Sequence, residues 1–279
     1  MSDVALHAKP TFLNIVEPVL QGLADPPLRD ALLDAYREEQ AALHTIERCF
    51  AALVARSHGV EQLRHFFHCW QETNNSASSV AGQGCRITLA AKERPLEDQM
   101  AYYRIVDNLQ RIVDEDLGAH GEAMHGELYY RMATAICGDD LWMSKKYSSE
   151  PAREFRAFML ARRLRDRSLL NGLLFTLIHE VFTHGEVELI HPMFQEWLAA
   201  RLDIPKKNAG KILAWITVHT GGLEAEHFGH AADAVLDYSR TSGEPIDPAA
   251  AKELFKTYLR NKAAVMAELL PSLGASEPS

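Results

Sequence analysis

Glutamate and histidine recur at helical spacing in two separate stretches of this chain of 279 residues. The first stretch, VDEDLGAHGEAMHGELYYRM, holds Glu115, Glu122 and His125 at steps of seven and three residues. On one helix, a step of seven is nearly two turns, so these side chains would project toward one point in a bundle core. Carboxylates and an imidazole that converge are suitable ligands for a divalent metal ion, although the same spacing also occurs on solvated helix faces. Gly118 and Gly121 leave a break in this helix as an alternative.

The second stretch, VHTGGLEAEHFGHAAD, repeats the chemistry later in the chain. Glu224 and His227 have the same Glu-x-x-His spacing as Glu122 and His125. Two such pairs on two helices are typical of carboxylate-bridged di-iron and di-manganese sites in helical bundles, because positions i and i+3 direct a carboxylate and an imidazole to one metal ion. The two pairs together predict a two-metal site.

A further carboxylate ligand is expected from the stretch LIHEVFTHGEVELIHPMF, which offers three glutamates. Glu180 and Glu188 lie two turns apart on one helix face, whereas Glu186 lies off that face. We favour Glu188 as the ligand and keep Glu180 and Glu186 as alternatives. For each of these three glutamates two other roles stay open, namely contact with the metal ligands instead of the metal, or a place on a polar surface.

These motifs resemble a known family. The run NLQRIVDEDLGAHGEAMHGELYYRM resembles the first metal helix of the haem-oxygenase-like dimetal oxidases, and HTGGLEAEHFGHA resembles their final metal helix, with the likeness extending over about 95–240. The resemblance implies an all-α protein that binds two Fe(II) ions, or a manganese and iron pair, and activates dioxygen. It would oxidise a small amine, amino acid or carboxylic acid.

The resemblance also implies the ligand set. Glu115 would take the place of a bridging carboxylate, and His219, which lies five residues before Glu224 rather than four, would require a one-residue bulge in its helix. The implied metal ligands are Glu115, Glu122, His125, Glu188, His219, Glu224 and His227.

The elements that must position these residues are all helical, because apolar residues recur at spacings of three and four and no alternating strand pattern is found. We expect a haem-oxygenase-like bundle of about eight helices in one domain over 1–270, followed by a disordered tail at 271–279. The stretch ETNNSASSVAGQGC is expected to be a loop or a weak helix, and Pro192 is expected to begin a helix. The other helices are expected at about 28–56, 60–70, 94–118, 121–137, 153–164, 167–190, 208–239 and 247–270.

Composition narrows the classes of partner and compartment. The net charge of -9 provides no basic surface for a phosphate backbone, so nucleic acid is not expected as a partner. No apolar run reaches the roughly 20 residues that span a bilayer, and the N-terminus lacks a basic segment followed by an apolar one, so a cytoplasmic protein is expected. The four cysteines show no metal-binding or disulfide spacing and are expected to be buried thiols.

The expected function is therefore a non-haem di-iron oxidase whose partners are dioxygen and a small molecule. Two alternatives stay open: a metal-free enzyme of the same bundle, similar to the thiamin-degrading and cofactor-biosynthetic enzymes, and a non-catalytic helical metal-binding protein. The sequence leaves open the substrate, the choice between iron and manganese, and the outcome among hydroxylation, desaturation, N-oxygenation and C–C cleavage. Pairing into a homodimer also stays open.

Overall fold

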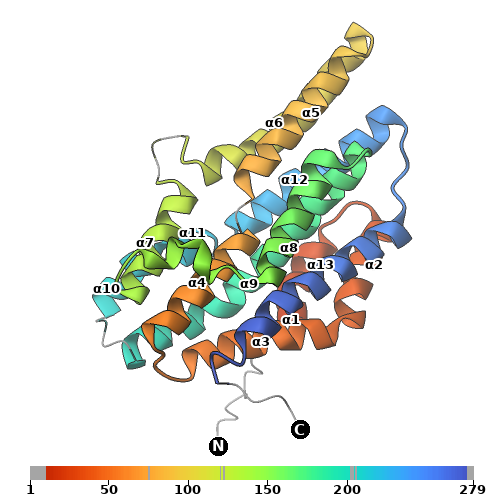
Figure 1. Ribbon diagram of the computed structural model, residues 1–279. Helices are drawn as coiled ribbons and strands as arrows, with labels where there is room; N and C mark the ends of the chain where they lie inside the picture. The colour runs from red at the N-terminus through yellow and green to blue at the C-terminus, as the bar shows by residue number, and fades with distance from the viewer. Residues whose placement is uncertain are drawn as a thin grey trace, which may run out of the picture.

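The computed structural model describes residues 11–74, 76–119, 121, 123–201, 204 and 206–274, and all regular elements in these ranges are helical (Figure 1). The all-α class is confirmed. The α-helices are α1 (Phe12–Gln21), α2 (Pro26–Glu38), α3 (Gln40–Val54), α4 (Val60–Asn74), α5 (Ala77–Lys92), α6 (Leu96–Asp116), α7 (His125–Cys137), α8 (Glu150–Leu160), α9 (Leu169–Arg201), α10 (Lys206–Ile212), α11 (Ala214–Val218), α12 (Leu223–Ser242) and α13 (Pro248–Leu269).

The prediction of about eight helices is wrong, because several expected helices are divided within the described ranges. The stretch 28–56 is divided at Glu39 into α2 and α3, and the stretch 208–239 is divided into α10, α11 and α12. The stretch expected to be a loop or a weak helix contains the end of α4 and the first half of α5. Local breaks of this kind leave the apolar spacing intact, so periodicity alone does not reveal them.

Pro192 does not begin a helix as expected but lies inside α9. Proline removes one backbone hydrogen bond and bends a helix, so its flanking turns need another source of stability. Ile190 and Phe194, on either side of it, are fully buried in the core. Burial of these side chains explains why α9, which is 33 residues long, is not interrupted at the proline.

Helix α9 is the central element of the core. Successive residues such as Leu177, Ile178, Val181 and Phe182 are all buried, which is the pattern of a helix enclosed on every side. α9 packs against α1 and α12, and α12 packs in turn against α6. The buried polar residues of α9 therefore face the neighbouring helices rather than solvent.

Helices α5 and α6 pack against each other as a long hairpin whose tip extends beyond the rest of the molecule (Figure 1). The other end of α6 enters the body of the protein, where α6 meets α12 and α7. On the far side, α13 packs against α2 and α3. The end of α6, the start of α7, the middle of α9 and the start of α12 thus meet in the interior, where His125, Glu224 and His227 lie.

The end of the chain is partly ordered. Residues 271–274 form a turn in which Leu273 is buried, and Arg56 and Gln62 donate hydrogen bonds to carbonyl groups of this turn. The rest of the predicted disordered tail lies outside the described residues. Among the helices that the structure describes, none is long and apolar enough to cross a membrane.

Candidate metal centre

The turn between α6 and α7 separates Glu115 from His125. Gly118 and Gly121 have φ angles of 65° and 89°, in the left-handed region that glycine adopts without a Cβ clash. The expected interruption at Gly118 is confirmed, but α7 begins only at His125. Glu115 and His125 therefore approach the centre from two helices rather than along one helix face, and Glu122 lies outside the described residues.

Asp116, His125 and His219 form a first cluster, which we call the Asp116 group. Their potential ligand atoms all lie within 4.8 Å of one another. His125 Nδ1 is 2.9 Å from Asp116 Oδ1, and the rings of the two histidines are 4.3 Å apart between centroids. The group joins the end of α6, the start of α7 and the end of α11, so it forms only in the folded chain.

The orientation of His219 leaves one ring nitrogen available to a metal ion. His219 Nδ1 lies 2.5 Å from the backbone carbonyl of Trp215. A carbonyl can only accept, so Nδ1 must carry the hydrogen and Nε2 must present its lone pair. Histidine ligands of metal ions are commonly oriented by a hydrogen bond of this kind on the other nitrogen.

Glu180, Glu224 and His227 form a second cluster, the Glu180 group, whose potential ligand atoms also lie within 4.8 Å of one another. His227 Nδ1 is 3.8 Å from Glu180 Oε2 and 3.9 Å from Glu224 Oε1. The other nitrogen of the same ring, Nε2, is 2.8 Å from Glu115 Oε2. The Glu-x-x-His pair of α12 thus points at one place, as its spacing predicts, and Glu180 reaches that place from α9.

Glu224 connects the two groups. Its Oε1 atom lies 3.6 Å from His219 Nε2 in the Asp116 group and 3.9 Å from His227 Nδ1 in its own group. Glu115, which the family resemblance places as the bridging carboxylate, contacts His227 and is about a third exposed. The carboxylate that lies between the two groups is therefore that of Glu224.

Burial disfavours the charged forms of Glu180, Glu224 and His219 in the metal-free protein. Burial raises the pKa of Glu180 to about 7, and burial together with the nearby carboxylates of Glu180, Asp116 and Glu115 raises the pKa of Glu224 well above its usual value. Burial and the neighbouring His125 lower the pKa of His219 to about 4. The carboxyl groups therefore resist ionisation, and the His219 imidazole resists protonation.

Asp116 behaves differently from the other buried acids. Burial works to raise the pKa of Asp116, but the hydrogen bond with His125 and the nearby histidines outweigh burial and hold the pKa below its ordinary value. A carboxylate beside two imidazoles is a suitable donor set for a divalent cation. Of the three carboxylates in the two groups, Asp116 is thus the one whose ionised form burial does not suppress.

Two carboxylate oxygens of the centre support the fit to metal ions. Glu180 Oε1 and Glu224 Oε2 are buried and make no hydrogen bond within the described part of the chain. Buried carboxylate oxygens normally have hydrogen-bond partners or bind cations, since leaving one bare costs about 1–3 kcal/mol. Together with three imidazoles, the donor set fits two hard or borderline cations such as iron or manganese.

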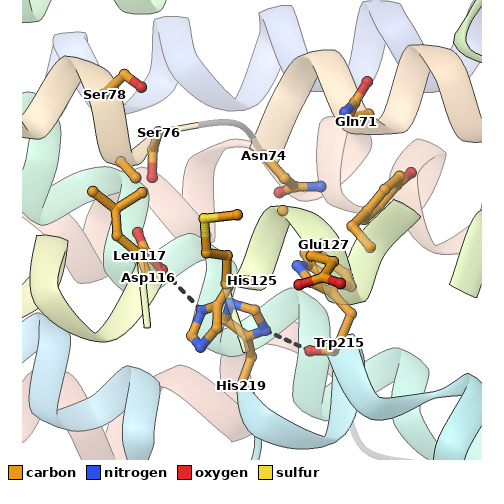
Figure 2. Close-up of a pocket in the computed structure, with 14 residues that line it drawn as sticks. Gln71, Asn74, Ser76, Ser78, Asp116, Leu117, His125, Glu127, Trp215 and His219 are labelled. Carbon is orange, nitrogen blue, oxygen red and sulfur yellow. Dashed lines mark hydrogen bonds and ion pairs between the residues drawn. The ribbon is translucent and has the colours of Figure 1, made fainter. Parts of the chain in front are cut away.

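A cavity of about 200 Å³ opens directly onto the Asp116 group. Figure 2 shows Asp116, His125 and His219 on one side of the cavity, with Asn74 and Ser76 on the other. Asn74 Oδ1 is buried and has no hydrogen-bond partner among the described residues. The cavity therefore has room for a small polar molecule next to the cluster.

The three candidate glutamates of α9 occupy three different environments. Glu188, the predicted ligand, is partly exposed and accepts a hydrogen bond of 2.9 Å from the backbone N–H of Gly221. Glu186 is fully buried and paired with Lys262 at 2.8 Å. Of the three glutamates, Glu180 is the one that the structure brings into the centre.

The region before α12 shows a turn where a bulge was expected. α11 ends at Val218, and Gly221 and Gly222 have φ angles of 74° and 111° before α12 begins. Two consecutive left-handed residues end a helix rather than insert one residue into it. The turn brings His219 next to Glu224 in spite of the five-residue spacing, so a bulge is not required.

Asp116 is not among the ligands predicted from the sequence. The aspartate follows Glu115 directly, and on a continuous helix neighbouring residues point about 100° apart, so only one of them was expected to face the centre. The usable signal was Gly118, because a helix that ends there changes direction and allows both carboxylates to reach inward. Asp116 meets His125, while Glu115 meets His227.

The chain was compared with models of protein families, with curated proteins and with solved structures, and none of them matches it.

Proposed function

We propose that this protein is a non-haem di-iron oxidase that activates dioxygen to oxidise a small organic substrate. The observation that carries the proposal is the contact of Glu224 with both ligand groups, which joins three histidines and three carboxylates in one buried cluster. Mixed imidazole and carboxylate donors on several helices of a bundle are characteristic of sites that hold two iron or manganese ions.

The residues that would hold the metal ions follow from the two groups. Asp116, His125 and His219 would hold one ion, and Glu180 and His227 would hold the other, with Glu224 between them. Bound iron would supply the redox chemistry with dioxygen that amino-acid side chains lack.

The residues of the chain would orient the metal ligands and form the cavity for the substrate. The Trp215 carbonyl fixes the His219 ring in the tautomer that presents Nε2 to the centre. Glu115, hydrogen-bonded to His227, orients that ring from the half-exposed side of the cluster. The cavity beside the Asp116 group would hold the substrate next to the metal ions.

Metal binding is the first test. Anaerobic titration of the protein with Fe(II), followed by metal analysis after removal of free iron, should give two irons per chain. Glu224→Gln and His227→Ala should each lose iron. Glu226 and His230 lie on the same helix outside the cluster, so Glu226→Gln and His230→Ala are matched controls that should keep both irons. Two irons retained in Glu224→Gln or His227→Ala would refute the ligand assignment.

Reaction with dioxygen is the second test. The reduced, iron-loaded protein should consume dioxygen and change its near-ultraviolet and visible spectrum on exposure to air. Iron binding without any oxygen-dependent change would refute the oxidase and support a non-catalytic metal-binding protein. Failure to bind iron or manganese would favour a metal-free enzyme of the same fold class.

A further inference from the structure

The aromatic rings beside the metal centre form a continuous series that leads to the surface. Trp215 lies 4.9 Å from His219 between ring centroids and 4.9 Å from Tyr129. Tyr129 is 5.8 Å from Trp142, and Trp142 is 6.2 Å from Tyr130. Four oxidisable rings thus connect a ligand histidine to the surface, and no distance between neighbouring ring centroids exceeds 6.2 Å. We call these four rings the ring series.

The two ends of the ring series differ in their surroundings. Trp215 lines the cavity beside His219 and is almost fully buried. Tyr130 is 36% exposed, and its hydroxyl lies 3.5 Å from Asp140 Oδ2, a carboxylate that can take up a proton. The inner end meets the place where dioxygen would react, and the outer end meets solvent beside a base.

The surroundings of the Tyr129 hydroxyl favour passage of an oxidising equivalent through this residue rather than its retention there. Tyr129 donates a hydrogen bond of 2.8 Å to the backbone carbonyl of Phe67, and burial raises its pKa well above the ordinary value. A backbone carbonyl does not accept the phenolic proton outright, so oxidised Tyr129 has nowhere to release it. The series therefore favours Tyr130 as the residue where an oxidising equivalent comes to rest.

A side branch of the aromatic cluster leads inward instead of outward. Trp70 lies 5.1 Å from Trp215, but its remaining neighbours include rings that are hard to oxidise, namely Phe50, Phe66, Phe67 and Phe194. Trp70 itself is fully buried. This branch has no exposed end within reach of those contacts.

We propose that the ring series carries oxidising equivalents away from the metal centre when no substrate is bound, and so protects the centre from self-oxidation. The inference rests on the proposed function for its oxidant, a dioxygen-derived oxidant at the metal site. An electron leaves Tyr130 and moves inward through Trp142, across Tyr129, and through Trp215 to that oxidant, which is reduced. The phenolic proton of Tyr130 moves to Asp140. A soluble thiol then returns a hydrogen atom to the Tyr130 radical and becomes a thiyl radical, and two such thiyl radicals combine to form a disulfide. Asp140 releases the phenolic proton to solvent.

Laser flash photolysis of the metal-free protein tests the path without any iron. Ultraviolet flashes remove electrons from tryptophan, and transient absorption then follows the decay of tryptophanyl radical and the rise of tyrosyl radical. The expected result is transfer of the radical from tryptophan to tyrosine in the wild-type protein. Tyr130→Phe should lose most of the tyrosyl signal and prolong the tryptophanyl signal, and Trp142→Phe should also reduce the tyrosyl signal.

Tyr103→Phe is the matched control, because Tyr103 has the same exposed fraction, 36%, and makes no aromatic ring contact within the described ranges. It should behave as the wild type does. Equal tyrosyl yields in Tyr130→Phe, Tyr103→Phe and wild type would overturn the proposal. Tyr130→Phe removes a single exposed oxygen, so near-ultraviolet circular dichroism should show an unchanged fold and keep this comparison valid even if Trp142→Phe does not fold.

The iron-loaded protein tests the protective role separately. On exposure to dioxygen without substrate, freeze-quenched samples should show a tyrosyl radical by electron paramagnetic resonance, and Tyr130→Phe should lose it and accumulate oxidised Trp215 by mass spectrometry. Dioxygen consumption with neither effect would overturn the protective role while leaving the proposed function intact. Absence of dioxygen consumption would refute the proposed function, and with it the source of the oxidant, whatever photolysis shows.

Discussion

Helix α9 buries two carboxylates six residues apart, and their surroundings are opposite in character. Glu186 is paired with Lys262 Nζ at 2.8 Å and accepts a hydrogen bond from Trp70 Nε1 at 3.2 Å. Lys262 also donates to Thr73 Oγ1 at 2.7 Å. Glu180 faces other carboxylates and His227, and one of its oxygens has no hydrogen-bond partner among the described residues.

This difference separates a structural ion pair from a binding site. A buried charge is tolerated when the chain supplies an opposite charge in contact with it, as Lys262 does for Glu186. The chain supplies no such compensation for Glu180 and Glu224, whose pKa values are raised by burial. Cations that bind from solution would compensate the buried carboxyl groups of Glu180 and Glu224. Glu186 needs no such cation, because it is paired with Lys262.

The largest effect is expected from removal of the cation at Glu186. Lys262→Met should leave a buried carboxylate unpaired and lower the free energy of unfolding by about 3–5 kcal/mol, measured by urea denaturation. Lys252→Met, which removes an exposed lysine of the same helix, should have a far smaller effect. A similarly small loss in Lys262→Met would contradict the distinction between the two regions.

The double variant sharpens this prediction. Replacing both partners, as in Lys262→Met with Glu186→Leu, removes the unpaired charge and should recover much of the lost stability. The iron content of the double variant should equal that of the wild type, because neither residue belongs to the two ligand groups. Loss of iron in a folded double variant would mean that Glu186 takes part in the metal centre.

The next effect concerns which glutamate of α9 binds metal. Fe(II) at about 100 times its dissociation constant from the Glu180 group should raise the free energy of unfolding of the wild type by about 2.7 kcal/mol through this one site. Glu180→Gln should lose most of this gain. Glu188→Gln should keep it, because the Glu188 carboxylate accepts a hydrogen bond from the Gly221 N–H and belongs to neither ligand group. Thermal unfolding with and without Fe(II) under anaerobic conditions measures both. The reverse pattern would restore Glu188 as the ligand.

A smaller effect should appear as pH dependence of the metal-free protein. The folded-state pKa of Glu180 is raised to about 7 from an ordinary value of 4.5. The stabilising contribution of the protonated Glu180 is therefore fully present below about pH 4.5 and is lost as pH rises through 7. Relative to wild type, Glu180→Gln should gain on the order of 1–3 kcal/mol between pH 5 and pH 8.

The comparison with Glu180→Gln cancels the contribution of His219, because His219 titrates in the same range in both proteins. Burial lowers the pKa of His219 to about 4, so its contribution falls as pH decreases from about 6.5 toward 4. Urea denaturation of both proteins across this range gives the difference directly. A difference that does not change between pH 5 and pH 8 would contradict the raised pKa of Glu180.

The smallest effect is expected at the turn that positions His219. Gly222→Ala forces a side chain onto a φ of 111° and should destabilise the protein by about 1 kcal/mol or more, and it should weaken iron binding. Gly229 lies inside α12 with open space around it, so Gly229→Ala should stabilise by about 0.5–1 kcal/mol. Effects of the same sign, measured by thermal unfolding, would contradict the role of the turn.

The features that could be predicted from the sequence are those in which chemistry depends on local spacing. The Glu224 and His227 pair points to one place because positions i and i+3 share a face of any helix, and the structure finds them together. The all-α class followed from apolar spacing for the same reason. The helix count was wrong because breaks such as Glu39 depend on how neighbouring segments pack, and packing leaves no periodic signal.

The sequence by itself determined that the chain is helical and that carboxylates and histidines are concentrated in two stretches. Only the tertiary structure decided that Asp116 joins His125 and His219, and that Glu180 rather than Glu188 meets His227. Both outcomes depend on where helices end and how far they reach into the core. Helix ends are set by left-handed glycines and by packing against distant segments, so residues far apart in the sequence become neighbours only when the chain is folded.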